Sequence, residues 1–254
     1  MLLLMICKKG RSILIKSKYK SYKRDYPSLP WIMKQTWIDN LFIHYPVKKE
    51  VLQKLVPTSL KVDTYDGFGW VSVVPYLITD MRGRGLPPLP GIKEYPGFNI
   101  RTYVMVNDKP GVFFFYLAAA NWFAAKCAKT FFGLPYFFEP LKMERHDESV
   151  FFEGKMSKGQ FNCQYHPIST PYMTSAGSLD EWLLERYCLY TINKQGKPLQ
   201  CNILHPSWIV FDGEAKIQEN ILRRNFNIVP ESEKPILHVA KRADVRIWPL
   251  VKGE

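Results

Sequence analysis

Polar side chains that can hold an organic anion recur along one short segment of the chain. Asn99, Arg101 and Tyr103 stand two residues apart, and a β-strand points alternate residues to the same side. We therefore expect these three groups to share one face of a strand. If that face lines a cavity, Arg101 can hold a carboxylate through two parallel hydrogen bonds. The alternative is an arginine on a solvated face or in a structural ion pair.

Two further arginines, Arg82 and Arg84, alternate with glycines in residues 81–85. Glycines let backbone amides approach an anion closely, so both arginines are candidate ligand-binding residues. A plain mobile loop is the simpler interpretation. The spacing matches neither the dinucleotide-binding fingerprint nor the P-loop.

The histidines and cysteines predict structural roles. No two histidines have the His-x-x-x-His spacing, and Cys163 with His166 is at best half a zinc site. The five cysteines are scattered, with no Cys-x-x-Cys pair, which favours reduced thiols in a cytosolic protein. No Gly-x-Ser-x-Gly motif occurs, although catalytic triads assemble in space and leave no sequence motif of their own. We predict no metal and no cofactor.

Alternating apolar residues between turn residues predict a succession of β-hairpins. Asp66-Gly67 and Asn107-Asp-Lys-Pro110 are the clearest turn signals. The predicted strands are 41–45, 60–65, 70–74, 103–106, 111–117, 150–156, 159–166, 187–192, 199–204, 236–239 and 243–248.

A few segments predict helices instead, at residues 47–55, 118–132, 179–186 and 215–226. The second holds six alanines, ends before Gly133, and has only Lys126 and Lys129 as charged residues. We expect that helix to be mostly buried. Many hairpins with few helices predict a mostly β (α+β) fold, an antiparallel β-barrel or curved sheet.

Composition and length are those of an ordinary soluble protein with one domain, which we place at residues 33–254. Of the 254 residues, 46% are hydrophobic and 23% are charged. Aromatic residues reach 15%, which suits a barrel with a bulky interior or a cavity lined by rings. No internal repeat or low-complexity linker divides this part of the chain.

The net charge of +12 is concentrated in residues 1–32, which carry eight basic residues and one acidic residue. The remainder holds 27 basic and 22 acidic residues, so the domain is only mildly basic. Residues 1–32 can be a mobile basic arm, a surface-membrane anchor or a non-native extension, and we favour Met33 as the start of the functional unit. No recognition motif accompanies the charge, and no apolar run is long enough for a secretory signal or a membrane span. We predict a cytoplasmic protein without nucleic-acid or membrane partners.

Several phrases occur together in a characteristic order and spacing. They are Leu41-Phe-Ile-His-Tyr-Pro46, Val56-Pro57 with Leu60, Asp66-Gly67 with Trp70-Val71, the proline run at 86–91, Asn99-x-Arg-Thr-Tyr-Val104, Lys109-Pro-Gly-Val112, Leu134-Pro-Tyr136 and Trp248-Pro-Leu250. The set resembles the YqjF-like family of uncharacterised bacterial proteins over residues 36–251. This resemblance implies the acetoacetate-decarboxylase-like fold, a β-barrel with a central cavity and a few flanking helices.

The same resemblance argues against the activity for which that fold is known. In acetoacetate decarboxylase a buried lysine beside a second lysine forms a Schiff base with a β-keto acid. The lysine pair follows a Gly-aromatic-Pro turn, which corresponds to Gly133-Leu-Pro135 here. Tyr136 and Phe137 occupy the two lysine positions, and neither side chain forms an imine. The Asn99 and Arg101 region also replaces a glutamate expected on the preceding strand.

Three functional hypotheses follow. The first is a protein that binds a small carboxylated or carbonyl compound, anchored by Arg101 and oriented by Asn99, Tyr103 and Tyr136. The second is a lyase or hydratase in the same cavity, using Tyr136 as acid-base or Lys126 as imine former. The third is a barrel without a ligand, with Tyr136 packed in the core and Lys126 extended to solvent. The sequence leaves ligand identity and homo-oligomerisation open.

Overall fold

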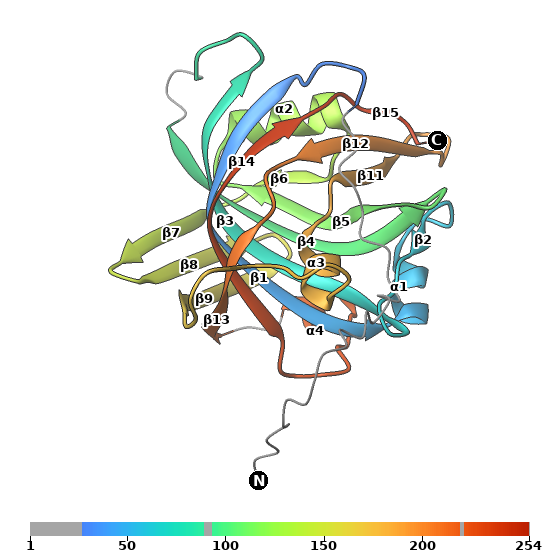
Figure 1. Cartoon of the computed structure of the whole chain (residues 1–254). Helices are drawn as coiled ribbons and strands as arrows, with labels where there is room; N and C mark the ends of the chain where they lie inside the picture. Colours follow the sequence, from blue (N-terminus) through green and yellow to red (C-terminus); the bar gives the residue numbers. More distant parts are fainter. Residues whose placement is uncertain (1–26, 89–92, 219–220, 254) are drawn as a thin grey trace, which may run out of the picture.

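The computed structural model describes residues 27–88, 93–218 and 221–253, and they form a mostly β molecule (Figure 1). Its longer strands are β1 Met33–Lys48, β3 Phe68–Gly83, β4 Glu94–Val106, β5 Lys109–Ala119, β7 Leu141–His146, β8 Ser149–Met156, β9 Gly159–Pro167, β11 Cys188–Ile192, β12 Pro198–Leu204, β13 Ile209–Ile217 and β14 Ile236–Ile247. The shorter strands are β2 Lys61–Val62, β6 Tyr136–Phe138, β10 Tyr172–Met173 and β15 Val251–Lys252. The helices are α1 Lys49–Leu55, α2 Trp122–Phe132, α3 Leu179–Leu184 and α4 Ile221–Phe226.

Seven strands close into a ring. They pair in the order β12, β11, β5, β4, β3, β1 and β14, and β14 then returns to β12 through Ile203 with Ile247 and Leu204 with Arg246. The prediction of a β-barrel with flanking helices is therefore confirmed. Its antiparallel character needs one correction, because β11 and β6 both pair with β5 in parallel.

The strands β13, β9, β8 and β7 extend the sheet beyond β14 as a separate wing (Figure 1). Two buried clusters result. One contains Phe42, Tyr76 and Tyr103 and fills the ring. The other joins Phe98 on β4 to Phe152 on the wing, because alternate residues of β4 point to opposite faces of the sheet.

Two of the predicted hairpins are confirmed, namely β4 with β5 and β11 with β12, and the predicted strands β8 and β9 also pair with one another. The predicted hairpin of 60–65 with 70–74 is wrong, since β2 pairs with β4 and only an isolated bridge joins Tyr65 to Phe68. Asp66 and Gly67 form the expected turn. Strand β2 nevertheless pairs with β4, because it forms two residue pairs there instead of a single bridge. The two predicted closing strands form one continuous strand, β14.

All four predicted helices are present, but each is shorter than predicted. Ala118 and Ala119 belong to β5, and α2 begins after Asn121, whose side chain accepts a hydrogen bond from the backbone of Ala124. Helix propensity is a weak preference that ladder pairing with β4 overrides. The prediction for residues 215–226 is wrong in its first part, where β13 continues to Ile217.

Contact with the ring begins before Met33. The indole Nε1 of Trp248 donates to the carbonyl of Leu29 at 2.6 Å, and the backbone amide of Ile32 donates to Ile247 at 2.9 Å. Residues 1–26 lie outside the described part of the chain. The predicted boundary after residue 32 therefore does not mark where packing on the domain starts.

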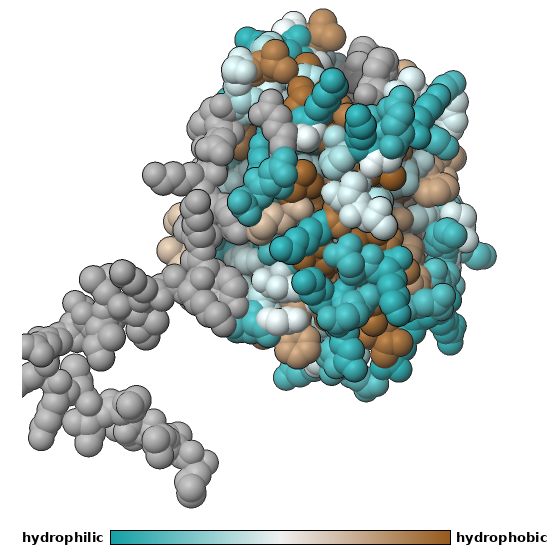
Figure 2. All heavy atoms as spheres, turned by 90° about the vertical axis from the view of Figure 1, so that its right-hand side faces the viewer, coloured by the Kyte–Doolittle hydropathy of each residue, from teal (hydrophilic) through white to brown (hydrophobic). Residues whose placement is uncertain are grey.

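The face that carries α1 and β2 is mostly hydrophilic, and its apolar residues lie in separate groups between polar ones (Figure 2). Within the described segments, no helix combines the length and apolar character that crossing a membrane requires.

Candidate functional site

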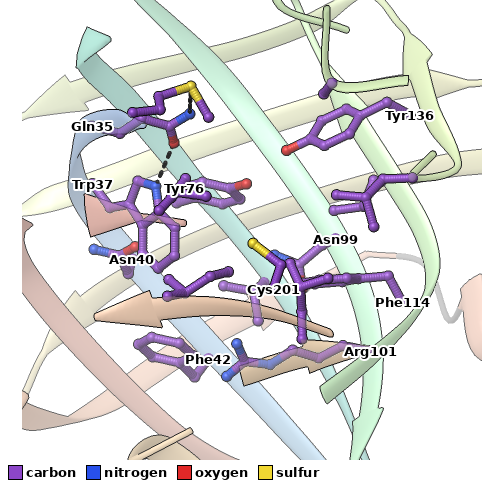
Figure 3. A pocket seen from close by; sticks show the side chains of 18 residues that line it. Gln35, Trp37, Asn40, Phe42, Tyr76, Asn99, Arg101, Phe114, Tyr136 and Cys201 are labelled. Carbon is purple, nitrogen blue, oxygen red and sulfur yellow. Dashed lines mark hydrogen bonds between the residues drawn. The ribbon is translucent and has the colours of Figure 1, made fainter. Parts of the chain in front are cut away.

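A small cavity lies inside the ring. The space open to the centre of a water molecule is about 80 Å³. Strands β1, β3, β4, β5, β11, β12 and β14, together with α2 and β6, contribute its walls (Figure 3). Its polar lining includes Gln35, Asn40, Tyr76, Asn99, Arg101 and Tyr136.

A bulge in β1 decides which of its residues reach the cavity. Gln35 and Trp37 point inward first, and then Asn40 and Phe42 do so, which breaks strict alternation. The change occurs at Asp39, whose φ of 52° lies in the left-handed region, and pairing with β3 shifts register over this stretch. An aspartate tolerates that backbone conformation better than most residues. The bulge therefore turns two more side chains into the ring.

A second register shift occurs between β4 and β5, at Ile100 and Arg101. It lets Phe114 and Leu117 both face the cavity, although they are three residues apart. Asn99 and Arg101 face it from β4 as the alternation predicts.

Arg101 brings an uncompensated charge into this space. It is the sole charged side chain among the described residues that line the cavity. Its Nε is buried without a hydrogen-bond partner, and no acidic side chain in the described ranges forms an ion pair with it. Its guanidinium lies 5.5 Å from the ring centroid of Phe42. A partly desolvated cation is costly unless an anion or water accompanies it, so the position is suited to an anion.

Two phenols face the same space. The hydroxyl groups of Tyr76 and Tyr136 point toward one another (Figure 3). Burial raises the pKa of Tyr76, while hydrogen bonds from Tyr136 and Asn99 and the charge of Arg101 lower it in part. Burial and then Tyr76 raise the pKa of Tyr136 well above its usual value. Both phenols are therefore protonated at neutral pH and act as hydrogen-bond donors.

Asn99 adds an acceptor to these donors. Its Oδ1 is buried and has no hydrogen-bond partner among the described groups. Buried polar atoms are rarely left unpaired, so an unpaired acceptor beside an unpaired cation indicates a missing polar partner.

The structure thus brings together three of the predicted site residues, Asn99, Arg101 and Tyr136. Tyr103 is a correction. It is fully buried but does not line the cavity, and its hydroxyl lies 2.6 Å from Ser72 Oγ and 3.3 Å from His44 Nδ1. Two residues along a strand span about 7 Å, which carries Tyr103 past the cavity although it shares the face of Arg101.

Lys126 is a second correction. It is exposed on α2, with its ammonium 4.5 Å from the ring centroid of Trp122. No lysine occurs among the described lining residues, so the imine role predicted for Lys126 has no geometric support. The helix is also less buried than predicted, since Trp122 is 56% exposed and Phe123 is 47% exposed.

The other predicted residues lie outside the cavity. Arg82 lines a neighbouring cavity, and Arg84 is exposed, with its guanidinium 5.6 Å from the ring centroid of Trp31. Phe137, in the second lysine position, is 37% exposed and stacks on Tyr116 with ring centroids 5.1 Å apart. Only Tyr136 of that pair reaches the cavity.

The sequence reasoning missed Gln35, Asn40 and Tyr76. Asn40 carried a signal, because a polar residue precedes the apolar run at 41–43. Gln35 carried no signal that separates an inward residue from an outward one. The described residues contain no cluster of histidine, cysteine or acidic side chains that could hold a metal ion.

Comparison with known proteins places the fold. Residues 34–244 match the family model DUF2071, described as an uncharacterized conserved protein. The uncharacterized protein YqjF of Bacillus subtilis (strain 168) is 42% identical over 226 residues, covering 87% of this chain and 93% of the relative.

Two solved structures of low sequence identity share the fold. Acetoacetate decarboxylase from Legionella pneumophila has a TM-score of 0.63 at 12% identity, and the match covers 98% of each chain. The enduracididine biosynthesis enzyme MppR, complexed with pyruvate, has a TM-score of 0.61 at 9% identity, covering 89% of this chain and 91% of its own. At such identities the likeness concerns the fold alone.

Proposed function

The chain belongs to the DUF2071 family of uncharacterized conserved proteins and has the acetoacetate-decarboxylase-like fold, and on this premise we propose that its cavity binds a small carboxylated or carbonyl compound. The observation that carries the proposal is Arg101, a cation in the cavity without an anionic partner among the described residues. A carboxylate is the planar, two-oxygen partner that a guanidinium fork fits best.

The remaining polar groups give each part of such a ligand a partner. Tyr136 or Tyr76 donates to a carbonyl oxygen, because both phenols keep their protons. Asn99 Oδ1 accepts from a hydroxyl or an enol. The space of about 80 Å³ is small, so it suits a small compound. A three- or four-carbon oxoacid is a compound of this class, and MppR was complexed with pyruvate.

Binding accounts for the site better than catalysis does. A raised pKa makes Tyr136 a poor general base at neutral pH. Imine chemistry needs an amine, and the described lining holds no lysine. In a barrel without any ligand, the buried Nε of Arg101 and the buried Oδ1 of Asn99 have no hydrogen-bond partner among the described residues, which is unfavourable.

Titration calorimetry with pyruvate and acetoacetate tests the proposal. The wild-type protein is expected to bind at least one of them, and Arg101→Gln is expected to weaken binding roughly 10- to 150-fold, the loss typical of a hydrogen bond to a charged group. Arg82→Gln is the matched control, because Arg82 lines only the neighbouring cavity. Absence of binding by the wild type, or equal affinity in Arg101→Gln, refutes the proposal.

A further inference from the structure

A second and larger cavity lies beside the first. It offers about 460 Å³ to the centres of water molecules, within the range of about 300–1,000 Å³ typical of ligand sites. Residues from the start of β1, the end of β3 and α2 form most of its wall. The wall is largely apolar and includes Ile32, Met81, Leu86, Tyr95, Phe123 and Ala124. Arg82 is its single charged side chain among the described residues.

Four side chains line both cavities and form the junction between them: Met33, Gln35, Ala128 and Tyr136. Gln35 is fixed there, since its Oε1 accepts from Trp37 Nε1 at 3.0 Å and its Nε2 donates to Met33 Sδ at 3.7 Å (Figure 3). Ala128 contributes only a methyl group to this boundary. A molecule held at Arg101 therefore reaches the apolar cavity by passing between these four side chains.

We propose that the physiological ligand is an amphipathic acid, with a short carboxylated or carbonyl head in the ring cavity and a hydrocarbon tail in the second cavity. This inference rests on the function proposed above and adds the ligand class. The ring cavity offers only about 80 Å³ to the centres of water molecules, so a larger molecule must continue elsewhere. The adjoining cavity is several times larger and apolar, which suits a hydrocarbon chain. A second charged group on the ligand would find a charged partner there only at Arg82, among the described residues.

One side chain reports on the second cavity. Cys127 lines it and is partly exposed, whereas Cys163, Cys188 and Cys201 are buried. Cys7 lies outside the described residues, so the experiment uses a Cys7→Ser protein. In that protein the rate of alkylation by iodoacetamide measures access to Cys127.

A series of straight-chain 2-oxoacids with three to twelve carbons tests the inference by calorimetry. Each methylene that leaves water tightens binding by about fourfold, so the affinity is expected to rise steeply with chain length and then level off when the cavity is full. Long acids are expected to slow the alkylation of Cys127, and pyruvate is expected to leave it unchanged.

Substitutions on α2 test the binding of the hydrocarbon tail separately from the binding of the carboxylated head. Ala124→Phe fills the second cavity alone and is expected to abolish the gain from chain length while pyruvate affinity stays constant. Phe123→Ala widens the mouth of the cavity at a 47% exposed position, which keeps the fold intact, and is expected to weaken long acids about fivefold. Lys126→Ala, on the exposed side of the same helix, is the matched control.

The outcomes distinguish this inference from the proposed function. Pyruvate binding that depends on Arg101, with affinity independent of chain length, overturns the tail while the proposed function stands. Absence of binding at every length overturns both. Long acids that protect Cys127 but bind equally well to Arg101→Gln reveal adventitious apolar binding, which also overturns the inference.

Discussion

Arg101, which is partly buried, and Arg186, which is buried, differ in what surrounds them. Arg186 forms an ion pair with Asp63 at 2.8 Å and lies 4.2 Å from the ring centroid of Trp182, so its charge has an anionic partner within the fold. Arg101 has aromatic contact with Phe42 but no anionic partner in the described ranges. A partly desolvated charge without an anionic partner is unfavourable, so Arg101 is the arginine suited to an external anion.

Tyr136→Phe tests the hydrogen bond assigned to this residue. The ring stays in place while the hydroxyl is lost, so oxoacid binding is expected to weaken about fivefold to tenfold, the worth of one hydrogen bond. Because the pKa of Tyr136 is raised well above 10, we also expect no change in affinity between pH 6 and pH 9 that depends on this hydroxyl. Calorimetry on both proteins at both pH values provides the measurement.

Tyr95→Phe is the matched control for that substitution. Tyr95 is a buried tyrosine that lines the second cavity, and its hydroxyl donates to Met81 Sδ at 3.2 Å. Its loss is expected to leave the binding of pyruvate unchanged. Equal affinities for wild type and Tyr136→Phe would contradict the role given to Tyr136.

At the level of elements, the parallel pairing of β5 with β11 closes the ring and positions the cavity wall. Leu189, from this pairing, lines the cavity and lies opposite Val112. The two strands approach closely at Gly111, where a Cβ atom would lie 2.7 Å from the carbonyl oxygen of Cys188 and 2.6 Å from the ring of Tyr190. Ring closure therefore requires a residue without a side chain here.

Gly111→Ala is expected to lower the free energy of unfolding by about 1–3 kcal/mol, because backbone must move to admit the methyl group. Urea denaturation measures the change. Gly154→Ala on β8 is the control, since its nearest neighbour is the end of the Leu141 side chain at 3.1 Å, which can shift. If Gly111→Ala is no less stable than Gly154→Ala, the close approach does not limit ring closure.

Across the whole molecule, one buried histidine couples stability to pH. His44 is fully buried and its Nδ1 lies 2.7 Å from Ser72 Oγ. Burial lowers its pKa well below the usual value, and the nearby His238 and Arg101 lower it further. Tyr103 is the remaining polar group facing it, at 3.3 Å. None of these neighbours stabilises a protonated ring, so His44 stays neutral in the folded protein.

This predicts acid destabilisation that starts near pH 6.5. In the unfolded chain a histidine takes up a proton near that pH, whereas folded His44 does not. The unfolded state thus binds more protons as the pH falls, and the free energy of unfolding decreases by up to about 1.4 kcal/mol per pH unit. The stability from this group is fully present above about pH 6.5 and is lost as the pH falls below it.

Urea denaturation at pH 7.5, 6.5 and 5.5 measures this slope in the wild type and in His44→Gln. The variant is expected to be less stable at pH 7.5 but to lose less stability on acidification. His238, whose Nε2 lies 3.2 Å from Asp180, is present in both proteins. An identical slope in the two proteins would show that His44 is not the responsible group.

The sequence by itself determined the features that depend on near neighbours. Period-two alternation placed Asn99 and Arg101 on one face, turn residues defined two hairpins, and Tyr136 with Phe137 removed the lysine pair. These features are local, because strand alternation and tight turns involve residues a few positions apart.

The tertiary structure alone decided which of these residues form a site. The bulge at Asp39, the return of β14 to β12 and the parallel pair of β5 with β11 all depend on strands far apart in sequence. They determine that Arg101 has no acidic neighbour in the described ranges, that Tyr103 lies beyond the cavity and that Lys126 faces solvent. Whether a charge is paired is a property of its surroundings in space, which residue spacing along a strand does not contain.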